Sequence, residues 1–354
     1  MIEFLQQHAF LLFGAGYVLA HLLGLGMALH AILNGRTPQG TVAWLMALIA
    51  MPALAIPFYL FFGSPRFWGY IRARRAGDSR LTPVVEELIA NARGMDVLPE
   101  QTRQFMRVSS ALARMPFSRG NAAELLIDGE ATFDAICAAI AGAEHYVLVQ
   151  FYIIHDDGLG RRFRDVLLER ARAGVRVHLL YDEVGCWALP RAYLEQLREA
   201  GVEVSGFTSI GRRRSRFRIN FRNHRKVVVV DGRVAFLGGH NVGDEYLGLD
   251  PKLGHWRDTH VALRGPVVHA VQLAFLEDWY WSTERIPQLD WQPRMAAEPG
   301  VNTLVLPSGP ADELDTFAMY ILEAINAARH RLWIVSPYFV PDEGVIYALQ
   351  LAAL

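Results

Sequence analysis

Two long apolar stretches dominate the N-terminal part of the chain. Residues 10–33 and 41–63 contain no Asp, Glu, Lys or Arg over 24 and 23 residues. A helix of about 20 apolar residues crosses the ~30 Å hydrocarbon core of a bilayer. The pattern therefore predicts a transmembrane hairpin of two helices within residues 1–65. A signal peptide followed by a buried core helix is the alternative, but the basic segment that begins a signal peptide is missing.

The loop charges predict the orientation of this hairpin. The segment between the two stretches carries only Arg36, whereas residues 65–75 carry four arginines. Because basic loops remain on the cytoplasmic side of a membrane, the rest of the chain is predicted to be cytoplasmic. Residues 66–119 are expected to form a juxtamembrane linker with one amphipathic helix near residues 83–91.

From residue 124 onward, strand-like and helix-like patterns alternate. The apolar runs are nearly continuous, as in strands that are buried on both faces. Such runs cover residues 146–154, 175–181, 202–207, 226–230 and 234–237. Helical patterns cover residues 131–143, 160–173 and 189–200. The predicted fold class is α/β, with a mixed sheet between layers of helices in residues 120–300.

A repeat suggests that this domain begins a second time. The segment from Ala139 to Gly158 is echoed by the segment from Ala324 to Gly344, with one inserted residue. Residues 301–354 are therefore expected to be an incomplete second copy of the domain, because Leu354 falls in the helix after its first strand. Chance similarity is the alternative, since helix-then-strand segments share generic apolar patterns.

Composition narrows the chemistry. The formal net charge is −1, with 35 basic and 36 acidic residues, so no global field attracts nucleic acid. Only Cys137 and Cys186 are present, which excludes a disulfide framework and a cysteine-rich metal centre. Any anion binding must be local.

Candidate catalytic residues gather in one motif. His224, Lys226 and Asp231 have the spacing HxKx4D, and Gly238-Gly239-His240-Asn241 follows. Alternate side chains of a strand face the same way, so His224 and Lys226 are predicted to face one substrate. A neutral imidazole can attack phosphorus while an ammonium group neutralises the phosphate oxygens. The bland alternatives are a hairpin turn at Asp231-Gly232 and a purely structural histidine.

A basic run precedes the motif. Residues 212–226 hold eight basic residues and no acidic one, including Arg218, Arg222 and Arg225. This pattern predicts contact with anionic lipid headgroups at a membrane surface, and a solvated loop is the alternative. Arg222 and Arg225 are expected to lie nearer the site than the other arginines of the run.

The motif and its surroundings resemble the phospholipase D superfamily, and more closely the bacterial cardiolipin synthases. The similar segments share characteristic motifs and extend into the apolar hairpin. They are Arg36–Gly63, Gln150–Gly160, Asn220–Gly248, His255–Val268, Leu306–Pro310 and Ser336–Gly344. The resemblance implies a bacterial inner-membrane enzyme that transfers a phosphatidyl group between two phosphatidylglycerol molecules, yielding cardiolipin and glycerol. It also implies that neither a metal nor another cofactor is needed.

The resemblance also implies roles for individual residues. His224 is expected to form a phosphohistidine, with Lys226 and Asn241 as phosphate ligands. Asp231 is expected to act as a supporting carboxylate, and Asp258 to orient His224. Gly238 and Gly239 are expected to allow close approach of the backbone to the phosphate, and Gly239 replaces a serine that is common in the family. Arg218, Arg222 and Arg225 are assigned to lipid binding.

The chain departs from the family pattern in one respect. The family uses two HxKx4D motifs, and the sequence contains one. We therefore expect the chain to be the N-terminal part of such an enzyme, with self-association as one way to rebuild a site. A phospholipase D-type hydrolase or nuclease and a non-catalytic lipid-binding membrane protein are the alternative functions, and no nucleic-acid partner is expected.

Overall fold

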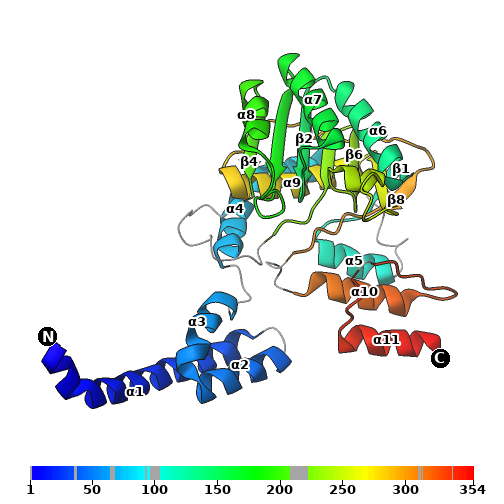
Figure 1. The fold of residues 1–354 in the computed structure, drawn as a ribbon. Coiled ribbons are helices and arrows are strands. Elements are labelled where there is room, and N and C mark those ends of the chain that lie inside the picture. The colour runs from blue at the N-terminus through cyan, green and yellow to red at the C-terminus, as the bar shows by residue number, and fades with distance from the viewer. Residues whose placement is uncertain are drawn as a thin grey trace. The chain divides into compact units, whose positions relative to one another are not determined.

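The computed structural model describes residues 2–35, 38–63, 68–91, 94–95, 104–207, 222–309, 312, 314–336 and 338–354. Contacts divide the chain into two compact units. The first consists mainly of residues Met1–Ile71 and the second of most of the remaining chain. Figure 1 shows the elements of each unit, which are described separately below.

The N-terminal unit is helical. It contains α1 (Ile2–Asn34), α2 (Pro38–Ala50) and α3 (Pro52–Phe62). Gly24 lets the helices approach closely, because a Cβ there would meet the Leu48 carbonyl. The His30 ring is hydrogen-bonded to the Tyr59 hydroxyl at 2.7 Å, which links α1 to α3. Close packing and a polar link of this kind hold apolar helices together where water supplies no driving force.

The second apolar stretch forms two short helices instead of the single helix expected over residues 41–63. The break falls at Met51, whose φ of −139° and ψ of 61° are not helical. Pro52 is the cause, because proline disfavours a helical conformation in the residue before it. Within the described residues, Phe13–Asn34 of α1 is the helix that is long and apolar enough to cross a membrane.

The second unit is built on an eight-stranded mixed sheet. Its strand order is β4-β3-β2-β5-β6-β7-β1-β8. The strands are β1 (Ser118–Ile127), β2 (Tyr146–Phe151), β3 (Arg176–Tyr181), β4 (Glu203–Gly206), β5 (Val227–Val230), β6 (Val234–Gly238), β7 (Thr259–Arg264) and β8 (Val301–Thr303). β2, β3 and β4 are parallel, and the other neighbours are antiparallel. The expected mixed α/β sheet is confirmed.

Helices cover the two faces of the sheet unequally. Three helices, α6 (Asp128–Ala141), α7 (Gly158–Arg172) and α8 (Arg191–Glu199), pack on one face. Residues 147, 149 and 151 of β2 belong to this core. Residues 146 and 150 point to the opposite face, where they hydrogen-bond to α9 (Val267–Thr283). A strand buried on both faces has the continuous apolar run seen in its sequence.

The linker is more helical than expected. α4 (Trp68–Asn91) extends well beyond the predicted amphipathic segment, and α5 (Gln104–Ala113) occupies part of the expected irregular connection. Leu81 of α4 packs with Leu273 and Leu276 of α9 and with Trp291. The C-terminal part of α4 is therefore part of the second unit's core.

The segment that repeats the first domain lacks its expected strand. α10 (Thr316–Ala327) and α11 (Glu343–Ala353) are present, and Ile325 packs against Val345 and Ala348 between them. Residues 328–336 form no ladder with any described strand, and Val335 is 99% exposed. A strand needs a neighbour to satisfy its backbone groups, and the described sheet ends at β8 on this side.

We predict that the fold loses stability as the pH falls below about 6.5. His178, His240, His260 and His269 are at most 3% exposed. Burial lowers the pKa of each, that of His260 to about 3. The unfolded chain therefore binds more protons between these values and about 6.5. The contribution of these histidines to the free energy of unfolding is fully present above about pH 6.5. Below that pH it falls by up to ~1.4 kcal/mol per pH unit for each imidazole.

Melting temperatures of the full chain in detergent between pH 7.5 and 5 test this expectation. His178→Leu should weaken the pH dependence, because it removes one of the buried imidazoles. It should break no hydrogen bond, since neither ring nitrogen has a hydrogen-bond partner within the described residues. The exposed His145 supplies the control His145→Gln, which should melt like the unaltered chain. A His178→Leu chain with an undiminished loss of stability in acid would contradict the prediction.

Candidate functional site

Polar side chains meet at one end of the sheet. Tyr152 follows β2, and Asp182 follows the parallel strand β3. His224 and Lys226 precede β5, which runs antiparallel to β2. The ends of β2 and β3 and the beginning of β5 therefore lie together. The catalytic pair occupies an extended segment just before β5 instead of the strand itself.

His224 and Lys226 both contact the ring of Tyr152. The His224 imidazole stacks on it with a centroid distance of 3.8 Å and an interplanar angle of 19°. The Lys226 Nζ lies 5.4 Å from the centroid of the same ring. This ammonium group also donates a hydrogen bond of 2.7 Å to the His224 carbonyl oxygen. The predicted juxtaposition of imidazole and ammonium is thus present in the structure.

The local electrostatics favour opposite protonation states for the two groups. Burial, followed by the charge of Lys226, lowers the pKa of His224 below its ordinary value. Burial lowers the pKa of Lys226 to about 8, and the charges of Asp258 and Asp182 oppose this shift. Near neutral pH the imidazole is therefore mainly uncharged, and the ammonium remains mainly protonated. A neutral nucleophile beside a cation is the combination that attack on a phosphodiester requires.

Two buried carboxylates that were not predicted hold the segment around His224. Asp182 is 2% exposed and accepts a 2.8 Å hydrogen bond from the Asn223 backbone N–H. Asp278 on α9 is 1% exposed and accepts bonds of 2.7 Å from the side chains of both Asn223 and Arg225. An acidic residue inside the apolar pattern of α9 is the sequence feature that could have revealed Asp278.

Asp231, which was expected to act as a supporting carboxylate of the motif, lies away from this group. It is 4% exposed and accepts 2.8 Å bonds from the backbone N–H groups of Glu144, His145 and Tyr146. It lies five positions after Lys226 along β5, about 16 Å at ~3.3 Å per residue. Its carboxylate fixes the turn between α6 and β2 at the opposite end of the sheet.

The glycine and asparagine residues of the motif have different surroundings. Gly238 ends β6 and follows directly on the pair between Val227 and Leu237, so it is next to Lys226 in the sheet. Asn241 is 6% exposed, accepts a bond from the Ile153 N–H at 3.1 Å and donates one to the Tyr246 hydroxyl at 2.7 Å. Within the described residues, the Asn241 amide thus supports the loop after β2.

Asp258 lies against Gly239 instead of the His224 ring. A Cβ on Gly239 would meet the Asp258 carboxylate, so a larger residue at this position would require the Asp258 side chain to move. The carboxylate accepts a 2.7 Å bond from the Thr259 N–H. Among the described residues no hydrogen bond joins it to His224, so the expected orienting contact is absent. Its charge acts on Lys226, whose pKa it raises.

The predicted lipid-binding arginines have different surroundings. Arg222 is exposed and donates a 3.1 Å hydrogen bond to the Tyr152 hydroxyl. Arg225 turns inward and is paired with Asp278 at 2.7 Å, a structural contact that the sequence did not predict. Arg218 and the rest of the basic run before residue 222 lie outside the described residues.

Two further acidic residues accept backbone hydrogen bonds in the loops next to the site. Asp157 caps α7 through Gly160 and accepts a bond from the Asp244 N–H. Asp244 in turn accepts bonds from the N–H groups of Gly158 and Leu159. Each carboxylate thus satisfies free backbone donors of the other's segment.

The described residues hold no group of three or more His, Cys, Asp or Glu side chains arranged to bind a metal ion.

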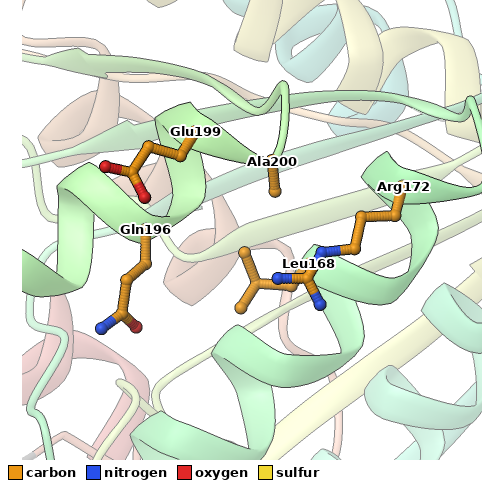
Figure 2. A pocket seen from close by; sticks show the side chains of 5 residues that line it. All are labelled: Leu168, Arg172, Gln196, Glu199 and Ala200. Carbon is orange, nitrogen blue, oxygen red and sulfur yellow. The ribbon is translucent and has the colours of Figure 1, made fainter.

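The hollow shown in Figure 2 lies elsewhere. It has a volume of about 300 Å³ between α7 and α8, and it is lined by Leu168, Arg172, Gln196, Glu199 and Ala200. It contains neither a nucleophile nor any residue of the HxKx4D motif. The candidate site is therefore the cluster at the sheet end, identified by its chemistry.

Two family models match parts of the chain. A family model described as "Cardiolipin synthase, PLD-like domain" matches residues 136–261, which include β2 to β6 and the HxKx4D motif. A second model, described as "Phospholipase_D-nuclease N-terminal", matches residues 22–64 in the helical unit. The two matches cover both units of the structure.

Individual relatives extend the similarity over nearly the whole chain. Cardiolipin synthase A of Pseudomonas syringae pv. syringae is 48% identical over 350 residues, covering 96% of this chain and 72% of the relative. Cardiolipin synthase A of Pseudomonas fluorescens is 47% identical over 346 residues, covering 97% and 72%. A solved phosphatidylserine synthase of Haemophilus influenzae is 15% identical, with 70% and 63% coverage and a TM-score of 0.48. The chain belongs to the cardiolipin synthase family, whose members carry a phospholipase D-like domain.

Proposed function

We propose that this chain transfers a phosphatidyl group from one phosphatidylglycerol molecule to a second, giving cardiolipin and glycerol. The observation that carries the proposal is the pairing of His224, with its lowered pKa, and the protonated Lys226 on one aromatic ring. Membership of the cardiolipin synthase family supplies the reaction class, a phosphatidyl transfer. The two lipids and the roles of individual residues are part of the proposal.

The reaction proceeds in two displacements. An imidazole nitrogen of His224 attacks the phosphorus, a P–N bond forms, and the P–O bond to glycerol breaks. The departing glycerol oxygen takes a proton from a general acid, a role that family resemblance assigns to the histidine of a second HxKx4D motif. Because this sequence contains one such motif, we propose that this histidine belongs to a second, self-associated copy of the chain. The same group, which is now a base, takes the proton from the hydroxyl of the second phosphatidylglycerol. The hydroxyl oxygen attacks phosphorus, a P–O bond forms, the P–N bond breaks, and free His224 is restored.

The cations around Tyr152 stabilise the charge that develops on the phosphate. Lys226 lies beside the nucleophile, and its positive charge faces the non-bridging oxygens as negative charge builds up in the transition state. Arg222 is exposed at the same ring and can hold the anionic lipid before reaction. Gly238, next to Lys226 in the sheet, leaves room for the phosphate.

The location of the reaction is the membrane surface. The apolar Phe13–Asn34 segment of α1 supports anchoring in a bilayer. We place the site on the cytoplasmic side of a bacterial inner membrane, with the N-terminal unit as a multi-pass anchor, because four arginines lie in residues 65–75. The basic run before His224 would then face anionic lipid.

Replacing the nucleophile tests the proposal directly. His224→Ala should abolish both cardiolipin formation and covalent labelling of the protein by phosphatidylglycerol that carries a radioactive phosphate. The label should be stable to alkali and labile to acid, as a phosphoramidate is. The purified full chain is reconstituted in vesicles, and lipid products and labelled protein are measured separately.

The exposed His145, which lies outside the site, supplies the matched control His145→Ala. This control should label like the unaltered chain. Labelling of the His224→Ala protein at the original level would overturn the proposal, and so would cleavage of an added oligonucleotide in place of lipid.

The pH dependence tests the role of Lys226. Its pKa of about 8 means that the rate of labelling per unit lipid concentration should fall above about pH 8, as the ammonium loses its proton. It should also fall in acid, below a midpoint under 6.5, as His224 becomes protonated. Lys226→Arg should remove the alkaline decline, because a guanidinium remains charged throughout this range.

Labelling rates between pH 5 and 10 measure both limbs. Lys226→Met should lose most activity at every pH, which separates the contribution of the charge from that of its titration. An alkaline limb that persists unchanged in Lys226→Arg would assign the decline to another group.

A further inference from the structure

Asp278 is a buried carboxylate that binds the catalytic segment, residues 223–226, on both sides of His224. Its Oδ2 accepts hydrogen bonds from Gln150 Nε2 at 2.9 Å, Asn223 Nδ2 at 2.7 Å and Arg225 Nη1 at 2.7 Å. The first donor belongs to β2, and the other two flank His224. One atom on α9 therefore joins the central strand to the segment that carries the nucleophile.

Alternation of side chains explains why the two neighbours of His224 reach Asp278. In an extended segment, successive side chains point to opposite sides. Asn223 and Arg225 point toward α9, and His224 and Lys226 point toward Tyr152. Fixing the odd-numbered side chains therefore fixes the direction in which the even-numbered ones project.

The backbone of the segment is held at the same point. The Asn223 N–H donates to Asp182, and the Asn223 side-chain oxygen accepts a 3.0 Å bond from the Arg225 N–H. The Arg225 guanidinium also donates to the Ala274 carbonyl of α9 at 3.1 Å. Both sides of His224 are thus attached to rigid elements of the fold.

The cost of burying Asp278 makes this arrangement informative. Its neighbours in α9, Phe275 and Trp279, are fully buried and apolar. A buried carboxylate is costly unless it is paired and hydrogen-bonded, and an apolar side chain of similar size often stabilises a fold as well or better. Besides Gln150 of β2, the compensating partners are Asn223 and Arg225, which flank His224. Their place in the chain points to a role in organising the catalytic segment.

We propose that Asp278 is a positioning residue, which holds residues 223–225 so that the His224 ring stays against Tyr152 and beside the Lys226 ammonium group. Its importance for the reaction rests on the proposed function. Attack on phosphorus needs the nitrogen within about 3–3.5 Å of its target in a fixed direction. A segment released from α9 would lose that direction while His224 and Lys226 themselves remained intact.

Chemical modification of His224 measures the position of the ring without any catalytic turnover. The full chain in detergent is treated with diethyl pyrocarbonate, and the modification rate of His224 is followed by peptide mass spectrometry from pH 5 to 8. In Asp278→Asn, His224 should react about tenfold faster, which corresponds to ~1.4 kcal/mol of lost restraint. The pH midpoint of the reaction should rise toward the ordinary value of about 6.5.

The direction of the midpoint separates release of the ring from a change of charge. Removing a nearby negative charge would by itself lower the pKa of an imidazole. A rise therefore requires that His224 has moved away from Lys226 and from its partly buried position. A structural effect elsewhere in the fold gives no such rise.

Gln272→Leu is the matched control. Gln272 lies on the same helix, is fully buried and bonds to Tyr146 at the other end of β2. This change should leave the His224 rate within about twofold of the original. Asn223→Ala removes one arm of the network and should accelerate modification in the same direction, so it serves if Asp278→Asn does not fold.

Two results would overturn the proposal. The first is an unchanged rate and midpoint for His224 in folded Asp278→Asn, or in Asn223→Ala if Asp278→Asn does not fold. The second is an equal acceleration in Gln272→Leu, which would indicate general loosening. The proposed function is tested separately by phosphate labelling of the protein. Accelerated modification without any labelling would support the positioning role and reject phosphatidyl transfer. Labelling with unchanged modification in the variants would support phosphatidyl transfer and reject the positioning role.

Discussion

The site depends on the geometry of a four-residue extended segment. Because side chains alternate along such a segment, residues 223 and 225 can face α9 while residues 224 and 226 face the opposite side. The first pair is held by Asp278, and the second pair meets the ring of Tyr152. Shifting the segment by one residue would reverse these directions and turn the His224 imidazole toward α9. The ends of β2, β3 and β5 meet here because β5 runs antiparallel to β2.

The surroundings of the segment also control its charges. Partial burial disfavours the charged forms of both His224 and Lys226, and the charge of Lys226 further disfavours protonation of His224. Asp258 and Asp182 counteract this effect for Lys226, so its pKa falls only to about 8. The result is an imidazole that keeps its lone pair and an ammonium group that keeps its proton at the same pH. A carboxylate bonded directly to Lys226 would hold the proton more firmly, but it would compete with the phosphate for the ammonium group.

The sequence predicted the parts of this picture that are local. Continuous apolar runs identified β2, β3 and β5, and the period of two brought His224 and Lys226 together. The sequence pattern could not predict contacts between α9 and the segment before β5. α9 follows the motif by some forty residues, and nothing in the spacing indicates that Asp278 contacts Asn223. The HxKx4D spacing also grouped Asp231 with the site, whereas β5 carries it to the other end of the sheet. Similarly, the apolar stretch 41–63 has the composition of one helix, but Pro52 divides it.

Three buried carboxylates illustrate how the fold separates support from reaction. Asp182, Asp231 and Asp278 all accept several hydrogen bonds, which offsets the cost of removing each charge from water. Asp231 and Asp182 are satisfied largely by backbone N–H groups and so fix turns, whereas the described partners of Asp278 are side chains. Backbone donors cannot withdraw without unfolding a turn. Side-chain donors can change rotamer, so the network around Asp278 is the place where the catalytic segment can be loosened while the sheet remains intact.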